Sequence, residues 1–149
     1  MNETIKGFNS GWNAYPSKQA AARKSRAQLY ALAERYNDAI ADLTTAIDLP
    51  PLDTSDLYTL RGQMYLALYE WDSALADYNT AIELDPSYAD AYYQRGVLYY
   101  SILQTGVELR ADALADFQHY LELAPDGYHA AEAARYVEQI AAELAALNG

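Results

Sequence analysis

The chain repeats one sequence pattern three times, and this repeat constrains its fold more than any other feature. An alanine, an aliphatic residue, an alanine, an aspartate and a large apolar residue recur at 39–43, 74–78 and 113–117. The copies begin 35 and 39 residues apart, and a proline follows each one. These prolines are Pro51, Pro86 and Pro125. Repeats of this length are typical of solenoids, in which each unit packs only on its neighbours.

A second pattern precedes each copy and consists of an arginine, a small residue and, four positions after the arginine, a tyrosine. It occupies residues 26–30, 61–65 and 95–99. In both patterns the apolar and small residues recur at helical spacing, as Ala74 and Tyr78 do. Each repeat is therefore predicted to be an antiparallel helix pair that leaves an apolar face for the next pair.

This double pattern resembles the tetratricopeptide repeat (TPR) family. The second repeat matches best, with the family's large, small and proline residues at Tyr58, Gly62, Tyr65, Ala74, Tyr78, Ala81 and Pro86. The third repeat has Tyr120 in place of a small residue, and the first has Ala27 for the glycine and Arg23 for an aromatic residue. The resemblance implies an all-α, right-handed α-solenoid of three TPR helix pairs plus a C-terminal capping helix.

The predicted organisation has three kinds of segment. They are an N-terminal aromatic arm at 1–19, repeats at about 20–53, 55–88 and 89–127, and a capping helix at 128–149. The last segment has an apolar stripe and an acidic outer side, as the open end of a solenoid requires. Seven helices are expected in all.

Two connections between helices carry local signals. Asp85 followed by Pro86 is typical of a helix start, so we expect the first helix of the third repeat to begin there. Five residues are inserted in the third repeat, around residues 103–110. This insertion either lengthens the two helices or forms a projecting loop, and extra length alone does not indicate a functional loop.

The formal net charge of -11 argues against nucleic-acid phosphate as the main partner. The charge is also uneven along the chain. Residues 1–35 carry six basic and two acidic side chains, net +4, whereas residues 36–149 carry four basic and nineteen acidic ones, net -15. This asymmetry is a hint about partners.

Composition excludes several other classes. The chain has no cysteine, so it can hold neither a disulfide nor a cysteine-ligated metal. No apolar run approaches the roughly 18 residues that span a bilayer, and residues 1–7 lack the apolar core of a signal peptide. We expect a soluble protein with no membrane partner. A cytoplasmic location is favoured, and an extracytoplasmic one would require that an export signal had been removed.

The sequence offers little for catalysis. The two histidines, His119 and His129, do not form a metal-binding helical pair. Neither a glycine-rich phosphate loop nor a Gly-x-Ser-x-Gly motif occurs. We therefore expect a protein that is not an enzyme, with no catalytic residue, no cofactor and no metal.

The resemblance implies a peptide-binding groove along the first helices of the repeats. The family positions carry over to Lys24, Gln28, Thr59, Gln63, Leu66, Tyr93, Gln94, Val97 and Tyr100. The glutamines could hydrogen-bond an extended backbone, and the tyrosines could stack on ligand side chains. An adaptor or scaffold that binds a protein or peptide is the favoured function. A solvated helix face without a ligand is the alternative.

One known use of the family groove can be tested from the sequence. Chaperone-binding TPR domains hold the terminal carboxylate of a ligand with Lys, Asn, Asn, Lys and Arg. The corresponding residues here are Lys24, Gln28, Leu60 (or Thr59), Asp90 and Gln94. Only the lysine is kept, and Asp90 would repel a carboxylate, so a carboxylate-clamp co-chaperone is not expected.

An arginine and an aspartate recur together in all three repeats. The arginines are Arg26, Arg61 and Arg95, and the aspartates are Asp42, Asp77 and Asp116. The planar guanidinium suits two-point contact with a carboxylate at a partly buried position. We predict three structural salt bridges within a repeat or between adjacent repeats, with an anion-binding role as the alternative.

The N-terminal arm contains Phe8, Trp12 and Tyr15 among glycines and asparagines. Three aromatic residues in so short a polar segment are not typical of a linker. We predict that the arm docks on its own repeats or on a neighbouring molecule, with a plain extension as the alternative. This gives a second functional hypothesis, a structural self-associating module that sets its basic end against the acidic solenoid of another copy and forms a homo-oligomer.

Overall fold

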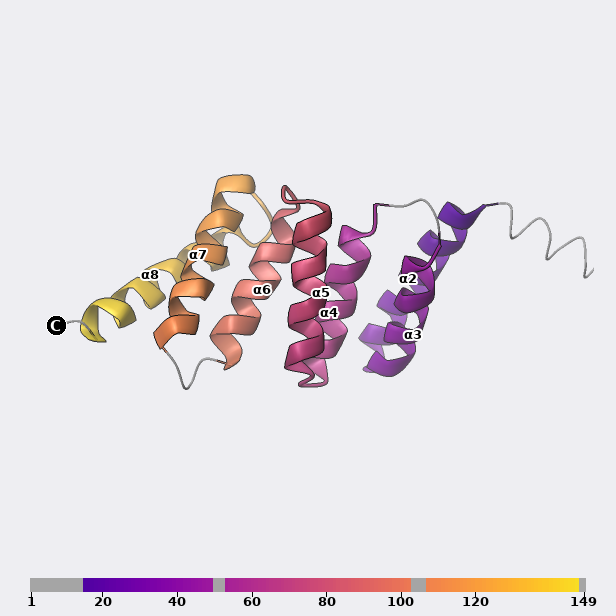
Figure 1. Cartoon of the computed structure of the whole chain (residues 1–149), viewed down its shortest axis with the longest axis horizontal. Helices are drawn as coiled ribbons and strands as arrows, with labels where there is room; N and C mark the ends of the chain where they lie inside the picture. The colour runs from indigo at the N-terminus through magenta and orange to yellow at the C-terminus, as the bar shows by residue number, and fades with distance from the viewer. Residues whose placement is uncertain (1–14, 50–52, 103–106, 148–149) are drawn as a thin grey trace, which may run out of the picture.

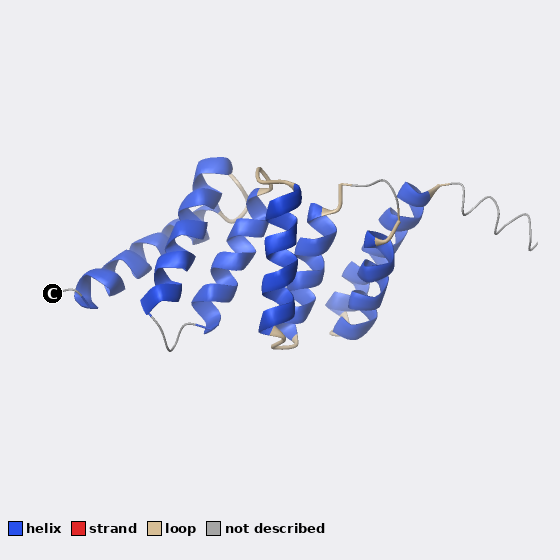
Figure 2. Cartoon of the chain, in the orientation of Figure 1, coloured by secondary structure: helices blue, strands red, loops and turns tan. Residues whose placement is uncertain are grey.

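In the computed structural model, which describes residues 15–49, 53–102 and 107–147, the helices stand in a row in chain order (Figure 1). The helices in these ranges are α2 (Pro16–Leu32), α3 (Tyr36–Ile47), α4 (Ser55–Ala67), α5 (Trp71–Leu84), α6 (Ala89–Ile102), α7 (Val107–Leu123) and α8 (Ala130–Leu147). The described residues form helices joined by loops, with no strand among them (Figure 2). The predicted all-α class is confirmed.

The helices pack as three pairs followed by a single helix. The pairs are α2 with α3, α4 with α5, and α6 with α7, and α8 packs on α7. Successive pairs meet where α4 packs on α3 and α6 packs on α5. The chain is therefore an α-solenoid in which each pair contacts its neighbours along the row, as predicted.

The small residue of each repeat lets the two helices of a pair approach closely. A Cβ atom on Gly62 would lie 2.5 Å from Cε1 of Tyr78, and one on Gly96 would lie 3.0 Å from Cε1 of Phe117. In the first pair, Ala27 belongs to the same buried cluster as Leu43. The smaller residue of the two, glycine, therefore occurs with an aromatic ring on the second helix. The larger one, alanine, occurs with a leucine.

The turns inside the first two pairs share one geometry. Glu34 and Tyr69 adopt the left-handed conformation, with φ of 56° and 62°. In each turn the amide of the next residue donates a hydrogen bond back to the preceding helix. In the first pair the Arg35 amide donates to the Tyr30 carbonyl at 2.8 Å. Neither position is a glycine, so the residue types do not indicate this conformation.

Helix α7 starts at Val107 and is longer than α5, its counterpart in the second repeat. Part of the predicted insertion, residues 107–110, therefore lengthens this helix. Residues 103–106 lie outside the described part of the chain.

One predicted helix start needs correction. Helix α6 begins at Ala89 rather than at Asp85, and Asp85 instead follows the last residue of α5. Its carboxylate accepts hydrogen bonds from the amide and the hydroxyl of Ser87, at 2.9 and 2.6 Å, and so holds a turn before α6. Helix α2 begins at Pro16, where a proline suits the first turn, so it includes residues 16–19 of the segment 1–19.

A bilayer-spanning helix is not found in the described ranges, because none of the helices there is both long and apolar enough.

Candidate functional site

The three predicted arginine–aspartate pairs are present, and each joins the two helices of one repeat. Arg61 donates from Nε and Nη2 to the two carboxylate oxygens of Asp77, both at 2.8 Å. Arg95 makes the same pair of 2.8 Å bonds to Asp116, and Arg26 bonds both oxygens of Asp42 at 2.5 Å. The prediction of structural salt bridges is confirmed.

The remaining guanidinium nitrogen of Arg61 and Arg95 reaches the preceding repeat. Nη1 of Arg61 donates to Oγ1 of Thr44 at 3.0 Å, and Nη1 of Arg95 donates to Oδ1 of Asn79 at 2.7 Å. The Arg61 guanidinium also lies 5.3 and 5.9 Å from the ring centres of two tyrosines of its own helix. The guanidinium groups of these two arginines already contact an aspartate, the preceding repeat and neighbouring tyrosine rings. They therefore stabilise the solenoid and have little capacity to bind an external anion.

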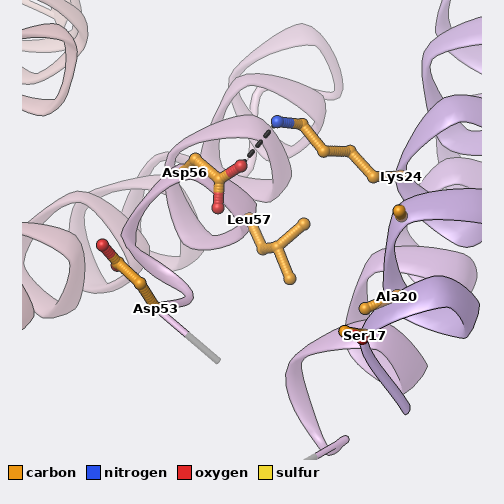
Figure 3. A pocket seen from close by; sticks show the side chains of 7 residues that line it. Ser17, Ala20, Lys24, Asp53, Asp56 and Leu57 are labelled. Carbon is orange, nitrogen blue, oxygen red and sulfur yellow. Dashed lines mark hydrogen bonds and ion pairs between the residues drawn. The ribbon is translucent and has the colours of Figure 1, made fainter. Parts of the chain in front are cut away.

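The predicted groove residues lie on the first helices α2, α4 and α6, and one of them, Lys24, forms an ion pair across the junction between α2 and α4. Nζ of Lys24 on α2 lies 2.5 Å from Oδ2 of Asp56 on α4. Figure 3 shows Lys24 reaching across the space between the two helices to Asp56, with Leu57 beside them. A hollow of about 230 Å³ opens here, lined by Ser17, Ala20, Ala21, Lys24, Asp53, Asp56 and Leu57. The lysine is therefore paired within the protein.

Two of the predicted groove residues are buried, which does not favour them as ligand contacts. Thr59 is 3% exposed, and its hydroxyl donates to the carbonyl of Ser55 one turn earlier. Tyr93 is 5% exposed and stacks on His129, with ring centres 3.9 Å apart. Tyr93 is covered because residues at the start of the last helical segment pack over it.

The other seven predicted residues retain exposed or partly exposed side chains. They are Lys24, Gln28, Gln63, Leu66, Gln94, Val97 and Tyr100. Tyr100 also contacts the last helix, because its hydroxyl accepts a hydrogen bond from Nε2 of Gln139 at 2.5 Å. Its ring centre lies 5.0 Å from that of Tyr136.

Helix α8 adds residues to this surface that the sequence analysis did not assign to it. A hollow of about 260 Å³ is lined by Glu132, Arg135, Tyr136 and Gln139. A signal for them was present, since the steps of four and then three residues from Glu132 to Gln139 match those from Tyr93 to Tyr100. The capping helix therefore occupies the place of a fourth first helix.

Acidic side chains gather at one edge of the same surface. The neighbouring residues Asp53, Asp56, Asp85 and Asp90 all act on Tyr88. Burial, together with these carboxylates, raises the pKa of Tyr88 to about 12. This edge is therefore negative and disfavours an acidic ligand.

The histidines have packing roles in the structure. His129 lies on Tyr93, and the His119 ring lies 4.3 Å from that of Tyr92. Across the described residues, no group of three histidines, aspartates or glutamates is placed to hold a metal ion.

Of the arm residues, Phe8 and Trp12 lie outside the described residues. Tyr15 immediately precedes α2 and is exposed, with Nζ of Lys18 4.7 Å from its ring centre.

Comparisons with known proteins agree with the repeat architecture. The TPR repeat family matches residues 62–102. The first TPR of Spaghetti (RPAP3), solved bound to the HSP90 peptide SRMEEVD, is 29% identical with a TM-score of 0.74, over 87% of this chain and 95% of that one. The second TPR domain of human RPAP3, solved with the HSP70 peptide SGPTIEEVD, is 26% identical with a TM-score of 0.69, over 84% and 97%.

A more distant structure shares the fold. The Sgt2 TPR domain from Aspergillus fumigatus is 20% identical with a TM-score of 0.76, over 89% of this chain and 83% of that one. No curated protein sequence matches the chain. The repeated sequence pattern, the three helix pairs with a terminal helix, and these matches together show that the chain contains a TPR repeat at 62–102 and has the all-α solenoid fold of TPR domains.

Proposed function

We propose that this chain is a protein-interaction module that binds an extended peptide along the surface of its first helices, α2, α4, α6 and α8. The observation that carries the proposal is the presence of two hollows on this surface, one between α2 and α4 and one on α8. Partly exposed side chains of α4 and α6, including Gln63 and Gln94, lie between them along the row. Such a path offers an extended segment polar side chains between the two hollows.

The chemistry of this path suits a peptide backbone. A glutamine amide offers donors and an acceptor together, which match the alternating groups of an extended main chain. Leu66 and Tyr100 add partly exposed apolar surface near the glutamines. Ligand side chains could pack on these residues while the backbone is held by the amides.

The charges favour a neutral or basic segment over an acidic C-terminus. Lys24 is already paired with Asp56, and Asp53 and Asp90 lie at the same edge. RPAP3 TPR domains of this fold bind peptides that end in EEVD. We infer that this chain uses the same surface as those domains but binds a ligand of a different charge, because its surface carries these aspartates.

Selection from a phage library of random twelve-residue peptides, followed by fluorescence anisotropy of a labelled selected peptide, tests this function. We expect Gln63→Ala to weaken binding by about 1 kcal/mol through the loss of peptide hydrogen bonds. The matched control is Gln118→Ala, which removes an exposed amide from the second helix α7 and should leave the affinity unchanged. The peptide SRMEEVD should not compete with the selected peptide.

Two results would overturn the proposal. One is the failure of selection to yield any peptide that binds the folded chain. The other is a selected peptide whose affinity falls with Gln118→Ala and not with Gln63→Ala, because its site would then lie on the second helices.

A further inference from the structure

The outer side of α2, at the indigo end of the row in Figure 1, leaves large apolar side chains in solvent. Leu29 is 66% exposed and Leu32 is 83% exposed. Leu29 follows Arg26 by three residues, as Met64 follows Arg61 and Leu98 follows Arg95. Yet Met64 is 6% exposed and Leu98 is 0% exposed, so the same repeat position is buried in the other two repeats.

The second helix of the preceding repeat covers this position in repeats two and three. Met64 shares a buried cluster with Leu43 and Ala46 of α3. Leu98 shares one with Ala74 and Tyr78 of α5. The outer side of α2 is thus a third copy of the same repeat junction, without a second helix against it among the described residues.

The arginine of repeat one also lacks the contact that crosses this junction. Arg61 and Arg95 use Nη1 to bond Thr44 and Asn79 of the preceding repeat. Within the described part of the chain, Nη1 of Arg26 has no such acceptor, and the Arg26 side chain is 56% exposed, against 16% for Arg61. The junction is therefore incomplete in both its apolar and its polar contacts.

The segment that directly precedes α2 has the sequence that this junction needs. Met1, Ile5, Phe8 and Trp12 follow one another at steps of four, three and four residues, which places them on one side of a helix. Ser10 lies sixteen residues before Arg26, the same separation as from Asn79 to Arg95.

The length of this segment fits as well. Four residues, 85–88, link α5 to α6, and three residues separate Trp12 from Pro16.

We propose that residues 1–14, which lie outside the described ranges, are the segment that completes this junction, docking in cis on the outer side of α2. Phe8 and Trp12 supply the apolar cover that Leu29 lacks, and Ser10 supplies an oxygen at the same separation from Arg26 that Asn79 has from Arg95. Covalent attachment to α2 gives the segment a high effective concentration over a second copy.

Tryptophan fluorescence of the full chain tests this docking, because Trp12 and Trp71 are the two tryptophans. In a Trp71→Phe background, verified as folded by circular dichroism, Trp12 should emit at short wavelength and resist acrylamide quenching. Adding Leu29→Asp should shift the emission to longer wavelength and raise the quenching constant several-fold. The matched control is Leu147→Asp, at the opposite end of the solenoid, which should change neither quantity.

Three outcomes would overturn the proposal. Trp12 emission typical of water in the Trp71→Phe chain would show that the arm is not docked. Protection of Trp12 that survives Leu29→Asp would place the arm elsewhere. Protection that disappears on dilution of the protein would show that the occupant belongs to a second copy.

Discussion

Repeat one and repeat two build the same arginine–aspartate pair in different surroundings. In repeat two, Arg61 lies near two tyrosines, bonds Thr44 of the preceding repeat and is 16% exposed. In repeat one, Arg26 is 56% exposed and shares its aspartate with Arg23, whose Nη1 lies 3.3 Å from Asp42. Arg23 occupies the position of the first tyrosine.

The difference shows that the contribution of the same repeated salt bridge to stability depends on the residues around it. A buried charge that loses its partner is costly because it cannot be solvated, whereas an exposed one is solvated by water. The pair in repeat two is therefore a mostly buried salt bridge, and the pair in repeat one is closer to a surface salt bridge. The comparison predicts unequal effects for equal substitutions.

The largest expected effect is that of Asp77→Ala, which leaves Arg61 mostly buried without its carboxylate. We expect a loss of about 3 kcal/mol in the free energy of unfolding. Asp42→Ala, the matched change in repeat one, should cost clearly less because both of its arginines can reach water. Urea unfolding followed by circular dichroism measures both, and equal losses would contradict the comparison.

The next effect concerns the small residue. Gly62→Ala should destabilise the chain by about 2 kcal/mol, because the added methyl meets the Tyr78 ring. Repeat one tolerates alanine at this position because it faces Leu43. The double variant Gly62→Ala with Tyr78→Leu copies that combination and should recover part of the loss in thermal unfolding. No recovery would show that the helix separation is fixed by other contacts.

A smaller effect should appear in the pH dependence of repeat one. Hydrogen bonds from Arg26 hold the pKa of Asp42 below its ordinary value of 3.8. This contribution to stability is complete above that value and is lost as the pH falls through the lowered pKa. The loss caused by Arg26→Ala should therefore shrink well below pH 3.8 in urea unfolding, and a loss independent of pH would contradict this assignment.

Repeat three should respond in the opposite sense. Burial raises the pKa of Asp116, and the hydrogen bonds from Arg95 offset only part of this shift. At pH values just above 3.8, the native state therefore binds a proton at Asp116 more readily than the unfolded chain does. A falling pH in this range stabilises the native state through Asp116. Amide hydrogen exchange measured across this pH range in α3 and in α7 reports the stability of repeat one and of repeat three separately.

The smallest effect is expected for Tyr78→Phe. The Tyr78 ring is fully buried, and its hydroxyl has no hydrogen-bond partner among the described residues. Phe117 already fills the same position in repeat three. We expect an unchanged or slightly higher stability, by at most about 1 kcal/mol. Tyr120→Phe is the control and should lose stability, because its hydroxyl accepts a hydrogen bond from the His129 amide at 3.0 Å.

The sequence predicted features that recur in every repeat. The three arginine–aspartate pairs followed from spacing alone, since each position is tested three times along the chain. The start of α6 did not, because Asp85 and Pro86 carry a signal that fits both a helix start and the turn that Ser87 closes.

The candidate surface was predicted less completely than the fold. The burial of Tyr93 depends on His129, which lies 36 residues later in the chain, and no local pattern reports that contact. The α8 residues were missed for the opposite reason. Their spacing continues that of Tyr93 and Tyr100, but the apolar stripe and acidic outer side of this segment are also typical of a capping helix.

Nuclear magnetic resonance of the side-chain amides tests the proposed binding surface most directly. Gln63 and Gln94 lie on the first helices, and Gln118 lies on the second helix α7. On titration with a selected peptide, the amide signals of Gln63 and Gln94 should shift while that of Gln118 stays in place. Shifts of Gln118 with Gln63 and Gln94 unmoved would contradict peptide binding on the first helices.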